Sequence, residues 1–173
     1  MQEVEGESHD HPHHRSMWSA FDEVNGVNNW AETPGHGFTR HLEFKNLMEG
    51  PVFGEFTAVG KWTSAEDEPV LDEIRTIRLY KVGANARLVD YDLSLTANYG
   101  EVTFNDTKEA GLLSIRVATS MDGSENGLIT NSEGGIGEND CWGYKARWTD
   151  YSGPAGDAKS TFGFTVFDHP SNP

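Results

Sequence analysis

The stretch ARLVDYDLSLTAN, residues 86–98, decides the fold class of this chain. Its apolar side chains alternate with polar ones, so one face of an extended backbone would carry Val89, Tyr91, Leu93, Leu95 and Ala97. The other face would carry Asp90, Asp92, Ser94 and Thr96. A hydrophobic period of two is typical of a half-buried β-strand, and we therefore predict a strand here.

Weaker alternation recurs in seven further runs, at residues 39–47, 53–64, 72–82, 101–106, 111–119, 142–152 and 160–169. Turn-forming residues separate these runs, and no long helical period lies between them. This pattern favours an all-β fold, an antiparallel sandwich or barrel with little helix. The glycine-rich residues 121–140 are expected to form a long loop.

Length and composition narrow the class of protein further. With 173 residues, the chain is expected to form a single domain, 1–173, in which residues 1–10 are a flexible N-terminal segment. The formal charge of −15 argues against nucleic acid and anionic membrane surfaces as partners. The sequence has no apolar run long enough to span a membrane and no signal peptide, so we expect a soluble chain whose compartment stays open. Its single cysteine, Cys141, excludes an internal disulfide and a multi-thiolate zinc site.

A histidine-rich stretch, HDHPHH, occupies residues 9–14. On an extended backbone His9, His11 and His13 would share one face, and two imidazoles at this spacing can bind one divalent metal. His11 and His13 are therefore candidate metal ligands. A further ligand would come from Glu109, Glu133, Asp168 or His169. The alternative is that the stretch is only a solvated extension.

Aromatic and polar residues are interleaved at residues 131–154, NSEGGIGENDCWGYKARWTDYSGP. Rings beside charged and amide groups are typical of sugar sites, because a ring stacks on the apolar face of a pyranose while polar groups bind its hydroxyls. Glu133, Trp142, Arg147 and Trp148 are candidates for such contacts, with core packing as the alternative.

Glu109 precedes a further apolar alternation at residues 111–117, and Arg116 lies within it. Arg116 is expected on the face opposite to Leu113, Ile115 and Val117. There, Glu109 and Arg116 could bind a polar ligand or transfer a proton, or they could form a cross-strand ion pair.

Five motifs together carry a resemblance to a known family: DHPHHRSMW (10–18), DEVNGVNNW (22–30), FNDTKEAGLLSIRVA (104–118), the run at 129–154, and FGFTVFDHPSNP (162–173). They resemble the bacterial PmoA-like family of unknown function, which is labelled "methane oxygenase PmoA". Members are longer at both ends, so this chain looks like a central fragment or a shortened member. It departs from the family pattern at Ser16, Asn28 and Asn29, where glycine, Asp and Phe are usual.

The label implies an integral membrane copper enzyme, which does not fit a chain without a spanning segment, and we discount it. The resemblance suggests instead a β-sandwich like that of sugar mutarotases, a supersandwich incomplete at its edges, by analogy of fold alone. In mutarotases a histidine and a carboxylate on a concave sheet face exchange protons with a sugar ring.

These observations lead to one main hypothesis and two alternatives. We expect a carbohydrate-directed protein, an isomerase, epimerase or hydrolase, with His13 or His14 transferring a proton opposite Glu109. The residues expected to bind the small-molecule or oligosaccharide substrate are Arg15, Asn25, Arg116, Glu133, Trp142, Arg147 and Trp148. The alternatives are a glycan-binding module without catalysis and a protein that uses a divalent metal. A divalent metal is the one cofactor that the sequence suggests. The oligomeric state stays open.

Overall fold

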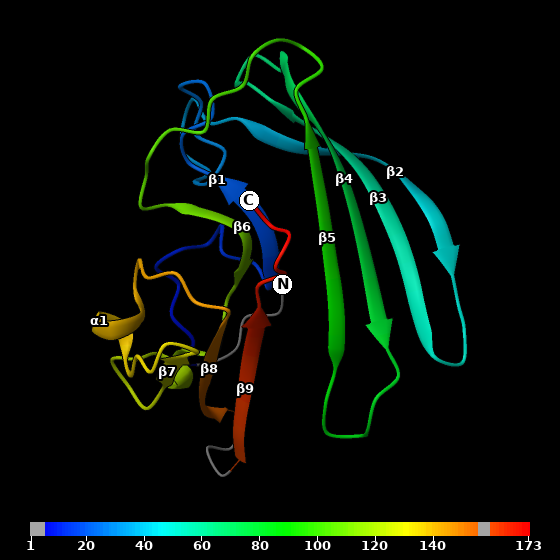
Figure 1. The fold of residues 1–173 in the computed structure, drawn as a ribbon. Coiled ribbons are helices and arrows are strands. Elements are labelled where there is room, and N and C mark those ends of the chain that lie inside the picture. Colours follow the sequence, from blue (N-terminus) through cyan, green and yellow to red (C-terminus); the bar gives the residue numbers. More distant parts are fainter. Residues whose placement is uncertain (1–5, 156–159) are drawn as a thin grey trace. The chain divides into compact units, whose positions relative to one another are not determined.

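The computed structural model describes residues 6–155 and 160–173 and contains two compact units (Figure 1). Unit 1 comprises Met1–Ser16 and Ile115–Pro173, and unit 2 comprises Met17–Ser114. The expectation of one domain over residues 1–173 stays a prediction.

Unit 2 is built around a four-stranded antiparallel sheet with the strand order β2–β3–β4–β5, drawn in cyan to green in Figure 1. The strands are β2 (Phe38–Met48), β3 (Phe53–Thr63), β4 (Pro69–Tyr80) and β5 (Leu88–Thr96). A smaller sheet pairs β1 (Met17–Phe21) with β6 (Ala110–Ile115).

The alternation in β5 is confirmed by burial from Tyr91 to Leu95, whereas Val89 of the predicted apolar face is 37% exposed. Tyr91, Leu93 and Leu95 are partly buried, whereas Asp92 and Ser94 between them are exposed. The strand pairs with β4 in continuous register, so the half-buried row continues across the sheet.

The core of unit 2 forms around Trp62 in β3. Trp62, Val24 and Leu71 are each at most 1% exposed, and they form one cluster. Phe21, Val70, Leu95 and Val102 pack against this cluster. Burial of these apolar side chains stabilises the unit, at roughly 1.5–3 kcal/mol for each large side chain that is fully removed from water.

A tight Asn-Gly turn follows β1. The backbone N–H groups and carbonyls of Val24 and Val27 bond to each other reciprocally, which leaves Asn25 and Gly26 at the tip. Their φ angles of 52° and 79° match a type I′ turn, which requires positive φ at both central positions and so favours Asn-Gly. The Asn25 side chain accepts a bond from Thr103 N–H at 2.8 Å and donates to the Glu101 carbonyl at 2.9 Å. It therefore fastens residues 101–103 to the turn.

Unit 1 contains a three-stranded antiparallel sheet with the order β7–β8–β9. The strands are β7 (Leu128–Asn131), β8 (Trp148–Ala155) and β9 (Ser160–Phe167). A 3₁₀ turn, η1 (Thr119–Met121), precedes β7, and a one-turn helix, α1 (Glu138–Cys141), lies between β7 and β8. Ser120 Oγ donates to the Pro154 carbonyl at 2.6 Å, which holds η1 against β8.

The prediction of an all-β fold with antiparallel sheets is confirmed, and the structure is consistent with a β-sandwich. Three details were wrong. Residues 101–106 form only an isolated bridge, Phe104 to Val24, instead of a strand. The predicted strand at 142–152 begins only at Trp148, and the predicted loop at 121–140 contains β7 and α1. Within the described ranges, no helix has the length and apolar character needed to cross a membrane.

Candidate functional site

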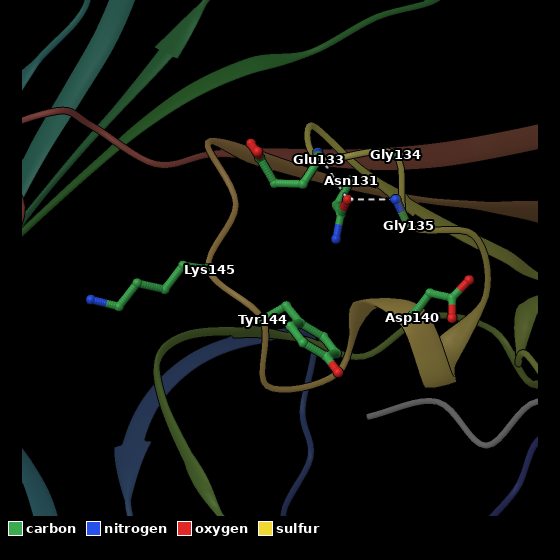
Figure 2. Close-up of a pocket in the computed structure, with 7 residues that line it drawn as sticks. All are labelled: Asn131, Glu133, Gly134, Gly135, Asp140, Tyr144 and Lys145. Carbon is green, nitrogen blue, oxygen red and sulfur yellow. Dashed lines mark hydrogen bonds between the residues drawn. The ribbon is translucent and has the colours of Figure 1, made fainter.

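A pocket of about 440 Å³ opens in unit 1 where the chain runs from β7 through α1 toward β8 (Figure 2). We call it the loop pocket. Its lining residues are Asn131, Glu133, Gly134, Gly135, Asp140, Tyr144 and Lys145. All of them come from one stretch of fifteen positions, so the pocket depends on how this single loop folds back.

Asn131 shapes the loop pocket from the end of β7. It is 5% exposed, and its Oδ1 accepts hydrogen bonds from the backbone N–H groups of Glu133 at 3.0 Å and Gly135 at 2.9 Å. These bonds turn the chain back on itself, as Asn side chains commonly do in tight turns. Because Oδ1 is engaged, the amide nitrogen is directed the other way, and Figure 2 shows it pointing into the pocket.

Tyr144 faces Asn131 from the other side of the loop pocket (Figure 2). The residue is 68% exposed, and its backbone N–H bonds to the carbonyl of Cys141, the last residue of α1. Glu133, Asp140 and Lys145 also line the pocket, although the Glu133 carboxylate accepts a bond from Ser132 Oγ at 2.7 Å and Figure 2 shows the Lys145 side chain extending away from Tyr144. A flat apolar ring opposite an amide donor, with carboxylates nearby, can bind a molecule that has both an apolar face and hydroxyls.

The predicted sugar-binding residues of this stretch are only partly in the loop pocket. Glu133 lines it, and Arg147 lies beside it, with Nε 3.7 Å from Glu133 Oε1. Trp142, which is 62% exposed, and Trp148, the first residue of β8, are not among the lining residues. Asn131 and Asp140 were missed as site residues, whereas Tyr144 and Lys145 belong to the aromatic and basic residues that suggested a sugar site in this stretch but were not among the predicted substrate-binding residues. The signal for the missed residues was the turn-forming N-S-E-G-G run followed by Tyr144, which places an aromatic ring after a tight loop.

The histidine-rich stretch forms a turn in unit 1. The His14 N–H bonds to the His11 carbonyl at 3.0 Å, and this turn breaks the extended alternation that was expected for residues 9–14. The His11 and His14 rings stack with centroids 4.7 Å apart, and the His13 ring meets His14 edge-on at 4.4 Å. We call His11, His13 and His14 the histidine cluster. Arg15 stays next to it through a bond from its Nε to the Pro12 carbonyl at 3.0 Å.

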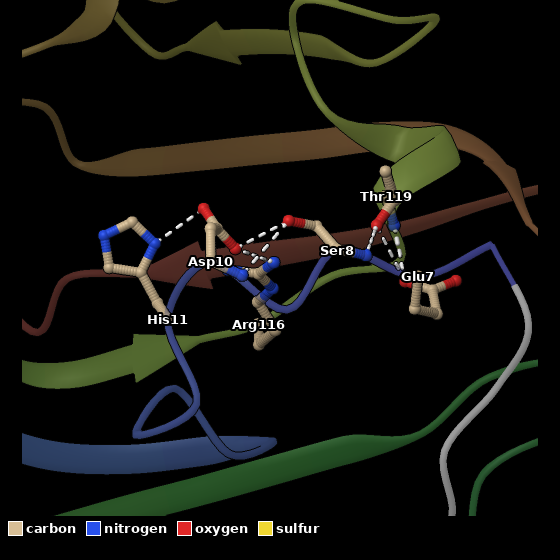
Figure 3. Close-up of polar contacts among 6 residues, drawn as sticks. All are labelled: Glu7, Ser8, Asp10, His11, Arg116 and Thr119. Carbon is tan, nitrogen blue, oxygen red and sulfur yellow. Dashed lines mark hydrogen bonds and ion pairs between the residues drawn. The ribbon is translucent and has the colours of Figure 1, made fainter.

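Asp10 links the histidine cluster to a distant segment of unit 1 (Figure 3). Its Oδ2 lies 2.6 Å from His11 Nδ1, and its Oδ1 accepts bonds from Ser8 Oγ at 2.7 Å and Arg116 Nη2 at 2.9 Å. These partners, Ser8 first, hold the pKa of the Asp10 carboxyl well below its usual range, because they favour the ionised form. A carboxylate at Nδ1 orients the imidazole and leaves Nε2 as the atom that can exchange a proton with a substrate.

The N-terminal segment is fastened to η1. Glu7 Oε2 accepts bonds from Thr119 N at 2.8 Å and Thr119 Oγ1 at 3.0 Å, and Ser8 N donates to Thr119 Oγ1 at 2.7 Å (Figure 3). Residues 1–5 of the predicted flexible segment lie outside the described residues. These bonds hold the N-terminal segment beside η1, and this position brings Asp10 within hydrogen-bonding distance of Arg116.

Glu109 and Asn25 belong to unit 2, whereas the histidine cluster belongs to unit 1. Glu109 lies 3.5 Å from Lys108 through its carboxylate, and its carbonyl accepts a bond from the Asp22 N–H. The pairing of His13 or His14 with Glu109 therefore stays a prediction. Both polar atoms of the Asn25 side chain bind backbone groups, and its substrate-binding role is likewise still a prediction.

In the part of the chain that the structure describes, no cluster of potential metal ligands supports metal binding. There, no three His, Cys, Asp or Glu side chains come together in a way that could hold an ion. Among the suggested additional ligands, His169 bonds through Nδ1 to Ser171 Oγ at 2.7 Å, and Asp168 accepts a bond from Asn172 at 2.7 Å. Metal binding by His11 and His13 stays a prediction.

Comparison with known proteins gives one match. No curated protein and no solved structure matches the chain. One family, described as "Family of unknown function (DUF6807)", matches residues 3–173. That description contains no PmoA label, so the resemblance to PmoA-like proteins and the idea of a fragment stay predictions. Because the match covers nearly the whole sequence, the chain belongs to DUF6807, a family of unknown function.

Proposed function

We propose that this protein binds a small sugar or a related polyhydroxylated molecule in the loop pocket. The observation that carries the proposal is the Asn131 amide nitrogen facing the Tyr144 ring across a pocket of about 440 Å³. This volume lies within the roughly 300–1,000 Å³ of ordinary small-molecule pockets. A monosaccharide could stack on the ring while its hydroxyls bind the amide and carboxylate groups.

The position of Asn131 supports selective binding. Its side chain is buried and held by two backbone bonds, so little conformational entropy is lost when a ligand accepts a bond from the amide nitrogen. The carboxylates of Glu133 and Asp140 are acceptors for sugar hydroxyls, which donate one hydrogen bond each. An apolar ligand of the same size would leave these groups unpaired and would bind more weakly.

A second candidate function is acid–base catalysis at the histidine cluster. The specific observation is the 2.6 Å contact between Asp10 Oδ2 and His11 Nδ1. An imidazole that is oriented in this way can act as a general acid or base, as an isomerase, epimerase or hydrolase requires. In this proposal His11 takes the proton-transfer role that the sequence suggested for His13 or His14.

The binding proposal is tested by calorimetric titration of the full chain with a panel of neutral monosaccharides and uronic acids. Tyr144→Ala should weaken the binding of any sugar that binds by about tenfold, which corresponds to about 1.4 kcal/mol of stacking. Trp142→Ala is the matched control, because Trp142 is a similarly exposed aromatic of the same loop that does not line the pocket. Equal weakening by both variants, or no binding by any sugar in the panel, would contradict the proposal.

Acid–base catalysis at the histidine cluster is tested separately, by measuring product formation. With a sugar that binds, product formation should be lost in His11→Ala while the binding affinity is retained. Binding by the unaltered chain without any turnover would leave a glycan-binding module as the function and would reject catalysis. Turnover that survives in His11→Ala would reject the assigned role of His11.

A further inference from the structure

A second, smaller pocket of about 150 Å³ lies on the main sheet of unit 2, and we call it the sheet notch. In the strand register His41 of β2 pairs with Gly60 of β3, which pairs with Glu73 of β4. Ala58 of β3 pairs with Arg75 of β4 in the same way. Directly paired residues share one face of a sheet, so Gly60 lies between His41 and Glu73, and Ala58 lies between Phe44 and Arg75.

The missing side chain at Gly60 creates the sheet notch. A Cβ at this position would lie 3.2 Å from the Arg40 carbonyl oxygen and 3.7 Å from Glu73 Oε1. Any larger side chain would therefore occupy the space between His41 and Glu73.

Glu73 forms a buried wall of the sheet notch. The residue is 3% exposed, and its carboxylate accepts bonds from Trp62 Nε1 at 2.7 Å and Arg75 Nη2 at 2.5 Å. A carboxylate in the interior is stable only when it is paired and hydrogen-bonded, and these two donors satisfy both oxygens. Glu73 is therefore a positioning residue that holds the Arg75 guanidinium at the notch.

Arg75 retains unused hydrogen-bonding capacity. Glu73 is its only acceptor among the described residues, and its Nε is buried without an acceptor there. The guanidinium carries five N–H donors in a planar fork that matches the two oxygens of a carboxylate. The Arg75 side chain is 23% exposed and lines the sheet notch, so part of it is within reach of a ligand.

His41 lies on the opposite side of the sheet notch from Arg75. Its ring contacts Phe44 at 4.3 Å between centroids, and in residues 6–155 and 160–173 its nitrogens have no hydrogen-bond partner. On this face of the notch Arg75 is cationic, and Glu73, which is already paired with it, is anionic. The Arg40 side chain, one position from His41, projects from the other face and pairs with Asp67 at 3.1 Å. Spare guanidinium donors beside a neutralised carboxylate favour an anionic ligand.

We propose that the sheet notch binds the carboxylate group of a small organic acid, with Arg75 donating to its oxygens and His41 contacting it from β2. The notch volume of about 150 Å³ equals that of an engineered cavity that accepts one benzene ring, so it suits a carboxylate with a few carbon atoms. The neutral Glu73–Arg75 pair remains intact on binding, because the ligand uses other donors of the guanidinium. This inference does not depend on sugar binding in the loop pocket, which lies in unit 1.

The test is an NMR titration of the full chain with lactate, followed at the imidazole resonances of His41. Lactamide is the neutral control ligand of the same size. The seven histidines are told apart with a His41→Gln variant, which removes one set of signals. We expect a saturable shift of the His41 signals with lactate and no saturable shift with lactamide.

Two arginines of β4 provide matched variants. Arg75→Met should weaken lactate binding at least tenfold, whereas Arg78→Met should not change it, because Arg78 lies an odd number of residues away and projects from the other face. Ala58→Leu is a second variant, which fills the floor of the notch without removing a charged group and should also abolish the shift. It decides the question if Arg75→Met does not fold. Equal shifts with lactamide, no saturable shift with lactate, or undiminished binding in a folded Arg75→Met or Ala58→Leu variant would overturn the proposal.

Discussion

Oδ2 of Asp10 lies 2.6 Å from Nδ1 of His11, and the other oxygen of the same carboxylate binds Arg116, 106 positions away in the sequence. One side chain therefore orients an imidazole and also joins the N-terminal segment to the chain that leads into η1. Catalysis by His11 and the stability of unit 1 should both depend on this carboxylate.

Replacing Asp10 should destabilise the protein in a pH-dependent way. Bonds from Ser8, Arg116 and His11 lower the Asp10 pKa in the folded chain below the value of about 3.9 in an unfolded chain. Stabilisation by the ionised carboxylate is therefore present above about pH 4 and is lost as the pH falls through the lowered pKa. The melting temperature of Asp10→Asn should lie below that of the unaltered chain from pH 5 to 7, and the two should converge below pH 4. Asp106→Asn, which changes an exposed carboxylate, serves as the control. A constant difference down to pH 2 would contradict this assignment.

Loss of Glu73 should strongly destabilise unit 2. Glu73→Ala removes the acceptor of Trp62 Nε1 and of Arg75, and breaking a buried pair of this kind costs about 3 kcal/mol. Urea unfolding curves of the variant and the unaltered chain measure the difference. Glu43→Ala is the control, because Glu43 is 56% exposed in its pair with Lys45 and its loss should change the free energy of unfolding by less than about 1 kcal/mol. Similar effects of the two substitutions would show that the Glu73 carboxylate is not buried as described.

Asn29→Leu should stabilise the protein. Both polar atoms of the Asn29 side chain are buried, and neither has a hydrogen-bond partner within the described part of the chain. Leu has the same branched skeleton of four side-chain heavy atoms without the desolvation penalty, so the free energy of unfolding should rise by about 1 kcal/mol. Asn28→Leu is a control that should instead lower the free energy of unfolding, since Asn28 Oδ1 accepts bonds from Trp30 N at 2.9 Å and Ala31 N at 2.8 Å. Thermal melts of both variants measure the effect, and a lower melting temperature for Asn29→Leu would reject this prediction.

Asn25→Ala should reduce stability without changing ligand binding. The substitution removes the bonds to Glu101 and Thr103 and places alanine at a positive φ, which together should cost about 2 kcal/mol. Asn85→Ala, in an exposed turn, should change stability little. A loss of sugar affinity in a folded Asn25→Ala variant would instead support the substrate-binding role that the sequence suggested for Asn25.

Strands could be predicted from the sequence where one face alone is buried. In β5 the alternation of Leu93 and Leu95 with Asp92 and Ser94 matches the burial of that strand. The strand β1 has no such pattern, because a polar residue, Ser19, is buried there and donates from Oγ to the Leu112 carbonyl at 2.5 Å. Residues 101–106 alternate as a strand would, yet their hydrogen bonds go to the turn at Asn25.

The candidate sites, like the strands, could be predicted from the sequence only in part. The sequence drew attention to residues 131–154 because aromatic and polar side chains are concentrated there, but which of them line the pocket depends on the bonds from Asn131 to the loop backbone. The turn at His11–His14 could have been read from Pro12, which favours the second position of a β-turn and argues against an extended chain. Glu73 and Arg75 could not be identified, because the notch depends on a cross-strand pairing with Gly60 that no local pattern records.

Sugar binding in the loop pocket is tested most directly by the side-chain amide signals of Asn131 in ¹⁵N-labelled protein, titrated with each neutral monosaccharide of the panel. The Asn131 amide nitrogen points into the loop pocket, so a bound sugar should shift its signals saturably, and Tyr144→Ala should weaken that response about tenfold (Figure 2). Trp142→Ala should leave the response intact. Asn131 signals that stay unchanged while a sugar binds, or that respond equally in Tyr144→Ala, would contradict sugar binding in the loop pocket.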